Sequence, residues 1–189
     1  DQFIKLSFQG QVEFVKNGNM TSKDTYIAPL IMENKTVTKK ILAKTGLKVP
    51  TGSEYTTIKQ AEKEYLKYAN VGFVIKPKST NYGLGISIFK KGANFSDYQE
   101  AVQLAFQEDT AILIEEFLPG QEYRFFVVKD EVKAILLRVP ANVVGDGIHS
   151  IEALVAKKNE DPLREKGYQS PLEKIELKET DQLMLKEQG

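Results

Sequence analysis

Three residues of this chain stand where a protein could bind a phosphate group. Gly83 and Gly85 lie in a loop between two apolar segments with the pattern of strands, and Lys76 ends the first segment. Glycines let backbone amides approach phosphate oxygens closely, and a lysine places a compact positive charge beside them. The three residues therefore indicate a phosphate-binding loop. A tight β-turn, with a lysine extending into solvent, is the alternative interpretation.

An acidic segment follows a later apolar strand. Glu115 and Glu116 end that strand, Phe117 and Leu118 begin a short connector, and Glu122 opens the next strand. A strand that ends in a connector exposes backbone donors and acceptors that can bind a nucleobase, and a carboxylate can accept hydrogen bonds from ribose hydroxyls. The alternative is a solvated turn that carries surface glutamates.

Two arginines lie in the hairpin that this segment opens. Arg124 shares a face with Glu122, whereas Arg138 stands among apolar residues, where burial would require a partner. An arginine here can clamp a phosphoryl group or a carboxylate, or form a structural ion pair with a glutamate. His149 is the only histidine and its neighbours suggest a loop or helix cap, so we assign it no role and expect no histidine-centred hydrolysis.

The composition is that of an ordinary globular protein. The 189 residues include 26 basic and 26 acidic side chains, and this balance argues against a dedicated nucleic-acid partner. No apolar run approaches the roughly 18 residues of a membrane helix, and no signal peptide opens the chain, so we expect no membrane partner. The absence of cysteine excludes disulfides and is compatible with a cytoplasmic location.

The order of the expected elements indicates an α+β fold with two lobes that meet near residues 117–120. We expect a hairpin over 3–16, strands over 73–75, 86–89 and 111–117, and a second hairpin over 122–139. Helices are expected over 34–46, from a cap at Thr57 with Ile58, Ala61 and Tyr65 facing inward, over 96–106 with Ser96 and Gln99 as a capping box, and over 150–158 with Ser150 as the cap. The tail from Asp161 is expected to be less regular.

Four segments, in order and at fitting distances, carry a family resemblance. They are Glu33-Asn-Lys35-x-x-Thr38-Lys39, Ile75-Lys76-Pro77, Gly83-x-Gly85, and Glu115-Glu116-Phe-Leu-Pro-Gly-x-Glu122-Tyr-Arg124. Together they resemble the ATP-grasp superfamily. Two later blocks, residues 138–147 and 159–164, are similar to cyanophycin synthetases and to bacterial bifunctional glutamate–cysteine ligase/glutathione synthetases. The sequence over roughly residues 12–178 is more similar to the second group.

The resemblance implies an ATP-grasp fold with ATP between two lobes. Residues 1–28 would form an entry segment with a hairpin, 29–117 the first lobe, and 118–189 a truncated second lobe. The cofactor-binding residues it implies are Lys35 and Lys76 at the phosphates, Ser79, Gly83 and Gly85 in a loop over the β- and γ-phosphates, Glu115, Glu116, Phe117 and Leu118 at the adenine, and Glu122 at the ribose. Arg138, and less directly Arg124, would lie near the transferred phosphate.

The resemblance also implies an activity. It is that of an ADP-forming carboxylate–amine ligase that joins γ-glutamylcysteine to glycine through an acyl-phosphate. The partners would be ATP, these two substrates, an upstream glutamate–cysteine ligase domain in the same chain, and a second copy in a homo-oligomer. A cyanophycin-synthetase-like amino-acid ligase domain and a non-catalytic nucleotide-binding domain are the alternatives.

Magnesium is the second cofactor that the resemblance implies. The superfamily binds two Mg²⁺ ions with acidic residues and an asparagine on late strands of the second lobe, and no Asp…Glu-x-Asn set precedes Gly189. We therefore expect the magnesium ligands beyond residue 189. We also expect the 189-residue piece by itself to lack ligase activity and to bind ATP weakly.

Overall fold

The chain forms two units. The computed structural model describes residues 3–16, 20–80, 83–165 and 170–188. Contacts between residues divide the chain into unit 1, Asp1–Phe117, and unit 2, Leu118–Gly189. Most of the buried apolar side chains among the described residues belong to unit 1. None of the described helices is long and apolar enough to cross a membrane.

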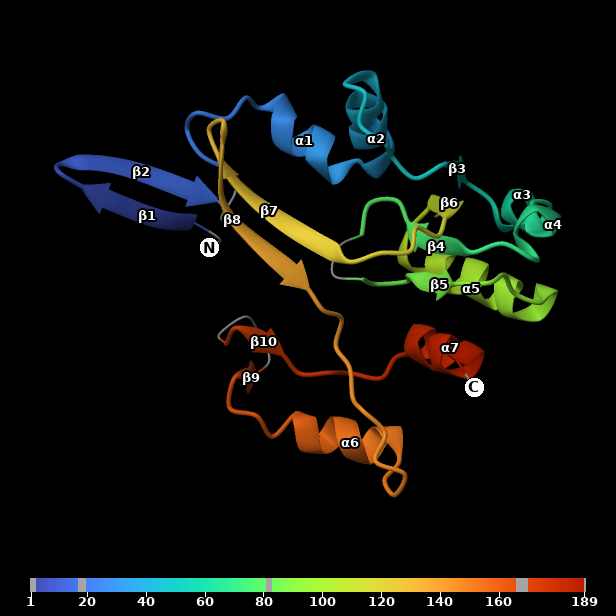
Figure 1. Ribbon diagram of the computed structural model, residues 1–189. Coiled ribbons are helices and arrows are strands. Elements are labelled where there is room, and N and C mark those ends of the chain that lie inside the picture. Colours follow the sequence, from blue (N-terminus) through green and yellow to red (C-terminus); the bar gives the residue numbers. More distant parts are fainter. Residues whose placement is uncertain (1–2, 17–19, 81–82, 166–169, 189) are drawn as a thin grey trace. The chain divides into compact units, whose positions relative to one another are not determined.

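Unit 1 is built around a four-stranded antiparallel sheet (Figure 1). Its strand order is β3 (Gly52–Tyr55), β6 (Ile112–Glu116), β4 (Phe73–Pro77) and β5 (Ser87–Phe89). The central strand β6 pairs Glu115 with Gly52 on one side and with Val74 on the other. This register confirms that the apolar runs expected near residues 73, 86 and 111 are neighbouring strands.

Side chains alternate between the two faces of this sheet because successive strand residues point in opposite directions. One face is apolar, and its buried residues are Tyr55, Phe73, Ile75, Phe89, Ile112 and Ile114. Helix α5 (Phe95–Glu108) packs on this face, and the Tyr98 ring lies 5.6 Å from the Phe73 ring. The opposite face carries charged residues, and it positions the site described below.

Helix α5 starts earlier than the sequence predicts. Ser96 was expected to cap it with Gln99 as the partner three residues on, but the N-cap is Asn94, whose side chain accepts a hydrogen bond from Asp97 N at 2.9 Å. The Asn94 amide also donates to the Asp97 carboxylate at 2.9 Å. Asparagine caps as well as serine, and the second hydrogen bond favours the earlier start.

Four short helices complete the first part of unit 1. They are α1 (Ile27–Glu33), α2 (Lys35–Lys44), α3 (Ile58–Glu62) and α4 (Tyr65–Tyr68). Asn34 caps α2, and Thr57 caps α3 as the sequence predicts. Ala61 is buried, which confirms the expectation that it faces inward, whereas the same expectation for Ile58 is wrong because Ile58 remains 39% exposed.

A hairpin precedes these helices. Strands β1 (Phe3–Phe8) and β2 (Gln11–Lys16) pair antiparallel around Gln9 and Gly10, which confirms the expected hairpin. All of the side chains of β1 are exposed.

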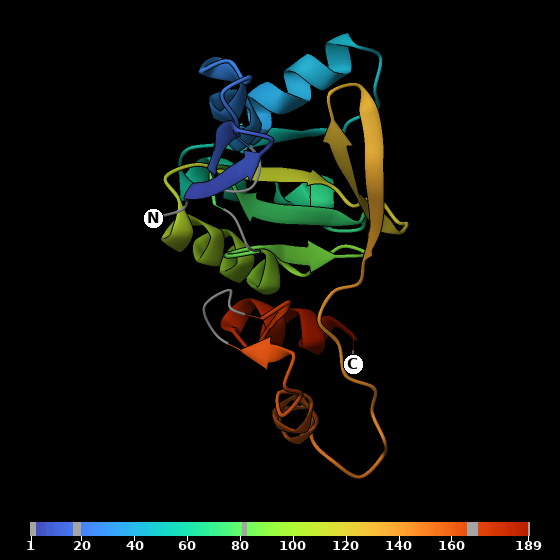
Figure 2. The same ribbon diagram turned by 90° about the vertical axis from the view of Figure 1, so that its left-hand side faces the viewer.

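Unit 2 contains a second hairpin and two helices. Strands β7 (Glu122–Val128) and β8 (Glu131–Arg138) form an antiparallel pair, drawn in yellow and orange in Figure 2. Their register is irregular at Phe126/Val127. Helix α6 (Ile151–Lys158) is capped by Ser150, as predicted. The segment after Asp161, expected to be less regular, forms β9 (Arg164–Glu165), β10 (Leu172–Glu173) and helix α7 (Glu179–Gln188).

Candidate functional site

The polar face of the sheet in unit 1 is organised around one buried carboxylate. Glu115 Oε1 lies 2.6 Å from Lys39 Nζ of α2, and Glu115 Oε2 forms an ion pair with Lys76 Nζ of β4. Lys76 and Glu115 share this face because Val74, two residues from Lys76, is the direct partner of Glu115 across the strands. A buried charge is tolerated only when it is paired, and this carboxylate has a lysine for each oxygen.

The buried position of Glu115 depends on the glycine opposite it. A Cβ added to Gly52 would lie 2.8 Å from Glu115 Cγ and 2.2 Å from Ile114 O. These distances are shorter than van der Waals contact, so a side chain at position 52 would displace the Glu115 side chain or separate β3 from β6. The missing side chain of Gly52 therefore makes room for the two ion pairs.

Lys35, at the start of α2, contacts the beginning of the glycine loop. Its Nζ donates hydrogen bonds to Lys78 O at 2.9 Å and Thr80 O at 2.7 Å. Burial is the main cause that lowers the pKa of Lys35, the nearby charge of Lys76 adds to it, and the carboxylates of Asp109 and Glu115 act in the opposite sense. The two carbonyls are neutral, and among the described residues no carboxylate forms a direct ion pair with Lys35.

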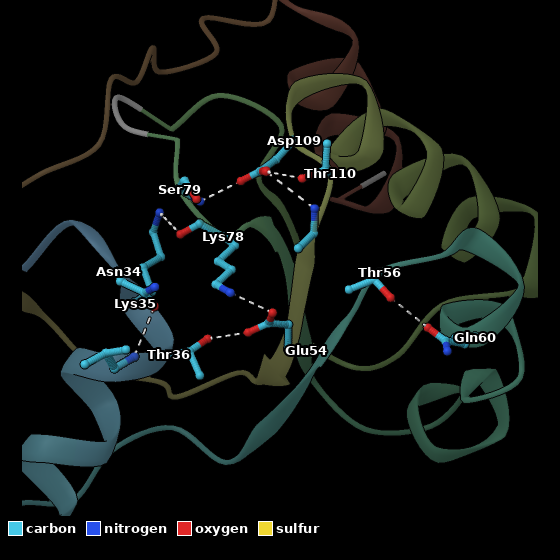
Figure 3. A network of polar contacts seen from close by, with 12 residues as sticks. Asn34, Lys35, Thr36, Glu54, Thr56, Gln60, Lys78, Ser79, Asp109 and Thr110 are labelled. Carbon is cyan, nitrogen blue, oxygen red and sulfur yellow. Dashed lines mark hydrogen bonds and ion pairs between the residues drawn. The ribbon is translucent and has the colours of Figure 1, made fainter. Parts of the chain in front are cut away.

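A second carboxylate connects α2 to the sheet (Figure 3). Glu54 of β3 accepts a hydrogen bond from Lys78 Nζ at 2.7 Å and another from Thr36 Oγ1 at 2.7 Å. These two hydrogen bonds lower the pKa of Glu54. Beside them, Asp109 Oδ2 accepts from Ser79 N at 2.7 Å, and this bond holds the first residues of the loop.

The cluster carries more positive than negative charge. Its four lysines are Lys35, Lys39, Lys76 and Lys78, and its three carboxylates are Glu54, Asp109 and Glu115. A surface region with excess positive charge and backbone groups of a glycine loop attracts anions. The residues present therefore fit a phosphate group, which is what Lys35, Lys76 and the loop were predicted to bind.

The loop needs glycine at two positions. Gly83 has φ +76° and Gly85 has φ +65°, a region of backbone conformation that other residues rarely adopt. A Cβ at Gly85 would also lie 2.8 Å from Pro77 Cγ, whereas among the described residues, apart from its chain neighbours, no atom lies within 4 Å of a Cβ at Gly83. Gly83 thus faces open space, which is the arrangement a loop needs in order to contact a ligand through its backbone. Residues 81–82 lie outside the described part of the chain.

The predicted adenine segment uses part of its backbone within unit 1. Glu116 N donates to Thr51 O at 2.9 Å, and Phe117 N donates to Gly72 O at 3.0 Å. The Glu116 carboxylate accepts from Thr51 N at 2.7 Å, which lowers its pKa. These two N–H groups are therefore occupied, and the other backbone groups of Glu116, Phe117 and Leu118 remain the candidates for binding a base.

The other predicted residues lie in unit 2. Glu122 pairs with Arg138 across the β7–β8 hairpin at 2.9 Å, and more than half of each side chain is exposed. Arg124 is two residues from Glu122 in β7 and therefore lies on the same face of the hairpin. The ion pair matches the structural alternative for Arg138, and the predicted roles at ribose and phosphate stay predictions. His149 Nδ1 lies 2.6 Å from Asp146 Oδ2 in the loop before α6.

Sequence reasoning overlooked several residues of this cluster, namely Lys39 as a site residue, Glu54, Lys78 and Asp109. A signal existed for two of them. Lys39 stands four residues after Lys35 and so lies on the same side of α2, and Lys78 stands two residues after Lys76 along the strand direction. The two carboxylates gave no such signal, because their partners are distant in sequence.

No metal ligand set was found among the described residues, where no three or more His, Cys, Asp or Glu side chains are grouped so that they could hold an ion. The described residues therefore offer no cage of three or more protein ligands, and we assign no chemical step to a metal held by them.

Matches to two protein families give the class of this protein. The family described as an ATP-grasp-like domain matches residues 1–27, and the family described as the D-ala D-ala ligase C-terminus matches residues 41–163. The second match covers more than half of the chain, so the chain belongs to the D-ala D-ala ligase C-terminal family and has an ATP-grasp-like fold.

Individual relatives can be aligned with this chain over its whole length. The glutathione biosynthesis bifunctional protein GshAB of Enterococcus faecalis is 62% identical over 189 residues, and that of Streptococcus thermophilus is 57% identical. A crystal structure of a bifunctional glutathione synthetase from Pasteurella multocida is 56% identical, with a TM-score of 0.49. The chain is covered completely in each comparison and spans 25% of the length of each relative. These identities confirm the expected resemblance.

Proposed function

We propose that this chain is the ATP-binding part of an ADP-forming carboxylate–amine ligase that joins γ-glutamylcysteine to glycine and so makes glutathione. The observation that carries the proposal is the 62% identity to a glutathione biosynthesis protein across all 189 residues. The relatives are about four times longer than the chain, which supports a neighbouring glutamate–cysteine ligase domain in the same polypeptide. We place the protein in the cytoplasm, where its nucleotide substrate is abundant.

The lysine cluster supports the part of the proposal that concerns ATP. Lys35 and Lys76 would neutralise the phosphates, and the loop from Ser79 to Gly85 would cover the β- and γ-phosphates with backbone groups. The segment from Glu115 to Leu118 would border the adenine. Within unit 2, Glu122 would bind the ribose, and Arg138 with Arg124 would face the transferred phosphate.

The proposed reaction has two steps. A carboxylate oxygen of γ-glutamylcysteine attacks the γ-phosphorus of ATP, the bond to the β-phosphate oxygen breaks, and ADP leaves with that electron pair. The amine of glycine then attacks the carbonyl carbon of the acyl-phosphate, the bond to the phosphate oxygen breaks, and an amide forms. Inorganic phosphate leaves and takes up the proton that the amine loses. The chain's contribution is to position the phosphates and neutralise their charge. Magnesium belongs to the proposal as the ion that shields phosphate charge in such transfers, with no ligand assigned among the described residues.

The activity is tested by measuring ADP release from the protein that carries this chain. ATP, γ-glutamylcysteine and glycine are supplied together and then with each omitted in turn, and the product is identified by mass spectrometry. We expect ADP release that requires both substrates, and glutathione as the product. ADP release with other amino acids but not with glycine would overturn the proposed substrates, and ATP binding without turnover would indicate a non-catalytic domain.

The phosphate assignment is tested with two alanine variants of the same protein. Lys76→Ala removes a cation from the cluster, whereas Lys91→Ala removes an exposed lysine outside it. Charged hydrogen bonds contribute roughly 1.5–3 kcal/mol, so Lys76→Ala should raise the Kd for ATP about tenfold or more, and Lys91→Ala should leave it unchanged. Equal effects, measured by isothermal titration calorimetry, would contradict the assignment of Lys76.

A further inference from the structure

The Glu115 side chain is shielded from anything that binds on the polar face. It is 3% exposed, whereas the side chains of Lys39 and Lys76 that pair with it are 21% and 22% exposed. A ligand can touch only atoms that are accessible at the surface. The lysines can therefore reach a bound molecule, and the Glu115 carboxylate reaches it only through them.

The carboxylate also holds cations together that would otherwise repel one another. Lys39 comes from α2 and Lys76 from β4, and each pairs with a different oxygen of Glu115. The charge of Glu115 favours the protonated form of Lys35 as well, against the opposing effect of Lys76. Removal of the negative charge of Glu115 would leave the ammonium groups of Lys35, Lys39 and Lys76 facing the same region without the carboxylate that offsets their repulsion.

We propose that Glu115 is a positioning residue of the nucleotide site, which fixes the ammonium group of Lys76 toward the phosphates, and that Lys39 anchors Glu115 from the opposite side. The inference rests on the proposed ATP-binding function. Lys39 thereby has a role in the site, and the Glu115 side chain takes no part in binding the adenine. Gly52 belongs to the same arrangement, because its missing side chain leaves the space that Glu115 occupies.

A positioning role for Glu115 should affect some ligands and not others. Glu115→Gln should weaken the binding of the triphosphate group and leave the recognition of the base untouched. The affinities for ATP and for inorganic tripolyphosphate should fall by a similar factor, roughly tenfold. Inosine triphosphate lacks the 6-amino group of adenine, so the ratio of its Kd to that of ATP should stay the same in the variant.

A double-mutant cycle provides the readout that a merely structural role would not change. Kd values for ATP are measured by calorimetry for the wild type, Glu115→Gln, Lys76→Met and the double variant of the protein that carries this chain. If Glu115 acts through Lys76, the double variant should bind ATP no more weakly than Lys76→Met alone. Glu100→Gln, an exposed glutamate of α5, is the matched control and should change no Kd.

Three results would overturn the inference. They are a changed ratio of ATP to inosine triphosphate affinity in Glu115→Gln, a double variant whose loss is the product of the single losses, and unchanged tripolyphosphate binding. If Glu115→Gln does not fold, the Lys39 variants decide. Lys39→Met should then weaken tripolyphosphate binding severalfold and Lys39→Arg should restore it, and the inference fails if Lys39→Met has no effect. If the wild type binds neither ATP nor tripolyphosphate, the proposed function itself fails.

Discussion

Lys35 is the residue whose behaviour should depend most clearly on pH. Its pKa is lowered, first by burial and then by the charge of Lys76, so it loses its proton at a lower pH than an ordinary lysine. Phosphate binding requires the charged form. The affinity for ATP should therefore be constant below the lowered pKa of Lys35 and should fall as the pH rises through it.

Calorimetric titrations with ATP across the alkaline pH range, for the wild type and a Lys35 variant side by side, test this expectation. Lys35→Arg is the informative variant. A guanidinium stays protonated throughout, so the arginine variant should keep its affinity where the wild type loses it. Parallel pH profiles for the two proteins would show that Lys35 does not control the decline.

At the residue scale, the sequence predicts which side chains belong to the site better than it predicts how they pair. Lys76 and Gly83 were proposed from residue type and from their places at the end of a strand and in the loop after it, and Lys35 was proposed from the family resemblance. The pairing of Lys39 with Glu115 joins residues 76 positions apart in the chain, and no local pattern encodes it. Such partners become visible only when strand register and helix placement are known.

At the element scale, the glycine loop allows a comparison of two similar substitutions. Gly83→Ala and Gly85→Ala both introduce a side chain at positive φ, which costs on the order of 1 kcal/mol. At Gly85 the new Cβ would also lie 2.8 Å from Pro77 Cγ and 3.0 Å from Glu108 Cγ. Crowding of this kind costs about 1–3 kcal/mol more, so Gly85→Ala should destabilise the protein further than Gly83→Ala.

Urea unfolding followed by circular dichroism measures both variants against the wild type. From highest to lowest, the expected order of unfolding free energies is wild type, then Gly83→Ala, then Gly85→Ala. A Gly83 variant that is the less stable of the two would mean that crowding at Gly85 relaxes without cost. ATP binding gives a second comparison of the two variants. Because Gly83 faces open space, Gly83→Ala should lower the affinity for ATP while it destabilises the protein less than Gly85→Ala does.

The elements that the sequence did not predict have physical explanations. Strand β3 is short and mostly polar, and its conformation comes from pairing with β6 rather than from its own propensity. Helix α1 contains Pro29, which the first turn accepts because its N–H would have no helical partner there. The alternating hairpins were predicted correctly, since a period of two over six or more residues is a strong local signal.

At the scale of the whole molecule, the two units should differ in local stability. The strands β4 and β6 lie in a buried sheet, whereas all of the side chains of β7 and β8 are exposed in this chain. A two-stranded hairpin without a covered face is only marginally stable. In the 189-residue chain, backbone amides of β4 and β6 should therefore exchange with deuterium at least about tenfold more slowly than those of β7 and β8.

Hydrogen exchange followed by mass spectrometry gives this comparison peptide by peptide. The hairpin β1–β2, whose side chains are mostly exposed, serves as an internal reference and should resemble β7–β8. Equal protection of the central sheet and of both hairpins would contradict the expectation.

The fold of the whole molecule could be predicted from the sequence, because four motifs in a fixed order identify an ATP-grasp fold even when each one is weak alone.

Gly52 and Glu115 also limit how this protein can evolve. A mutation that adds any side chain at position 52 would collide with Glu115, and a mutation that shortens residue 115 first would leave two lysines without their carboxylate. Each single step passes through an impaired intermediate, whichever comes first. The two codons are therefore expected to change together or not at all among descendants of this gene, and a library of random single substitutions should tolerate almost nothing at either position.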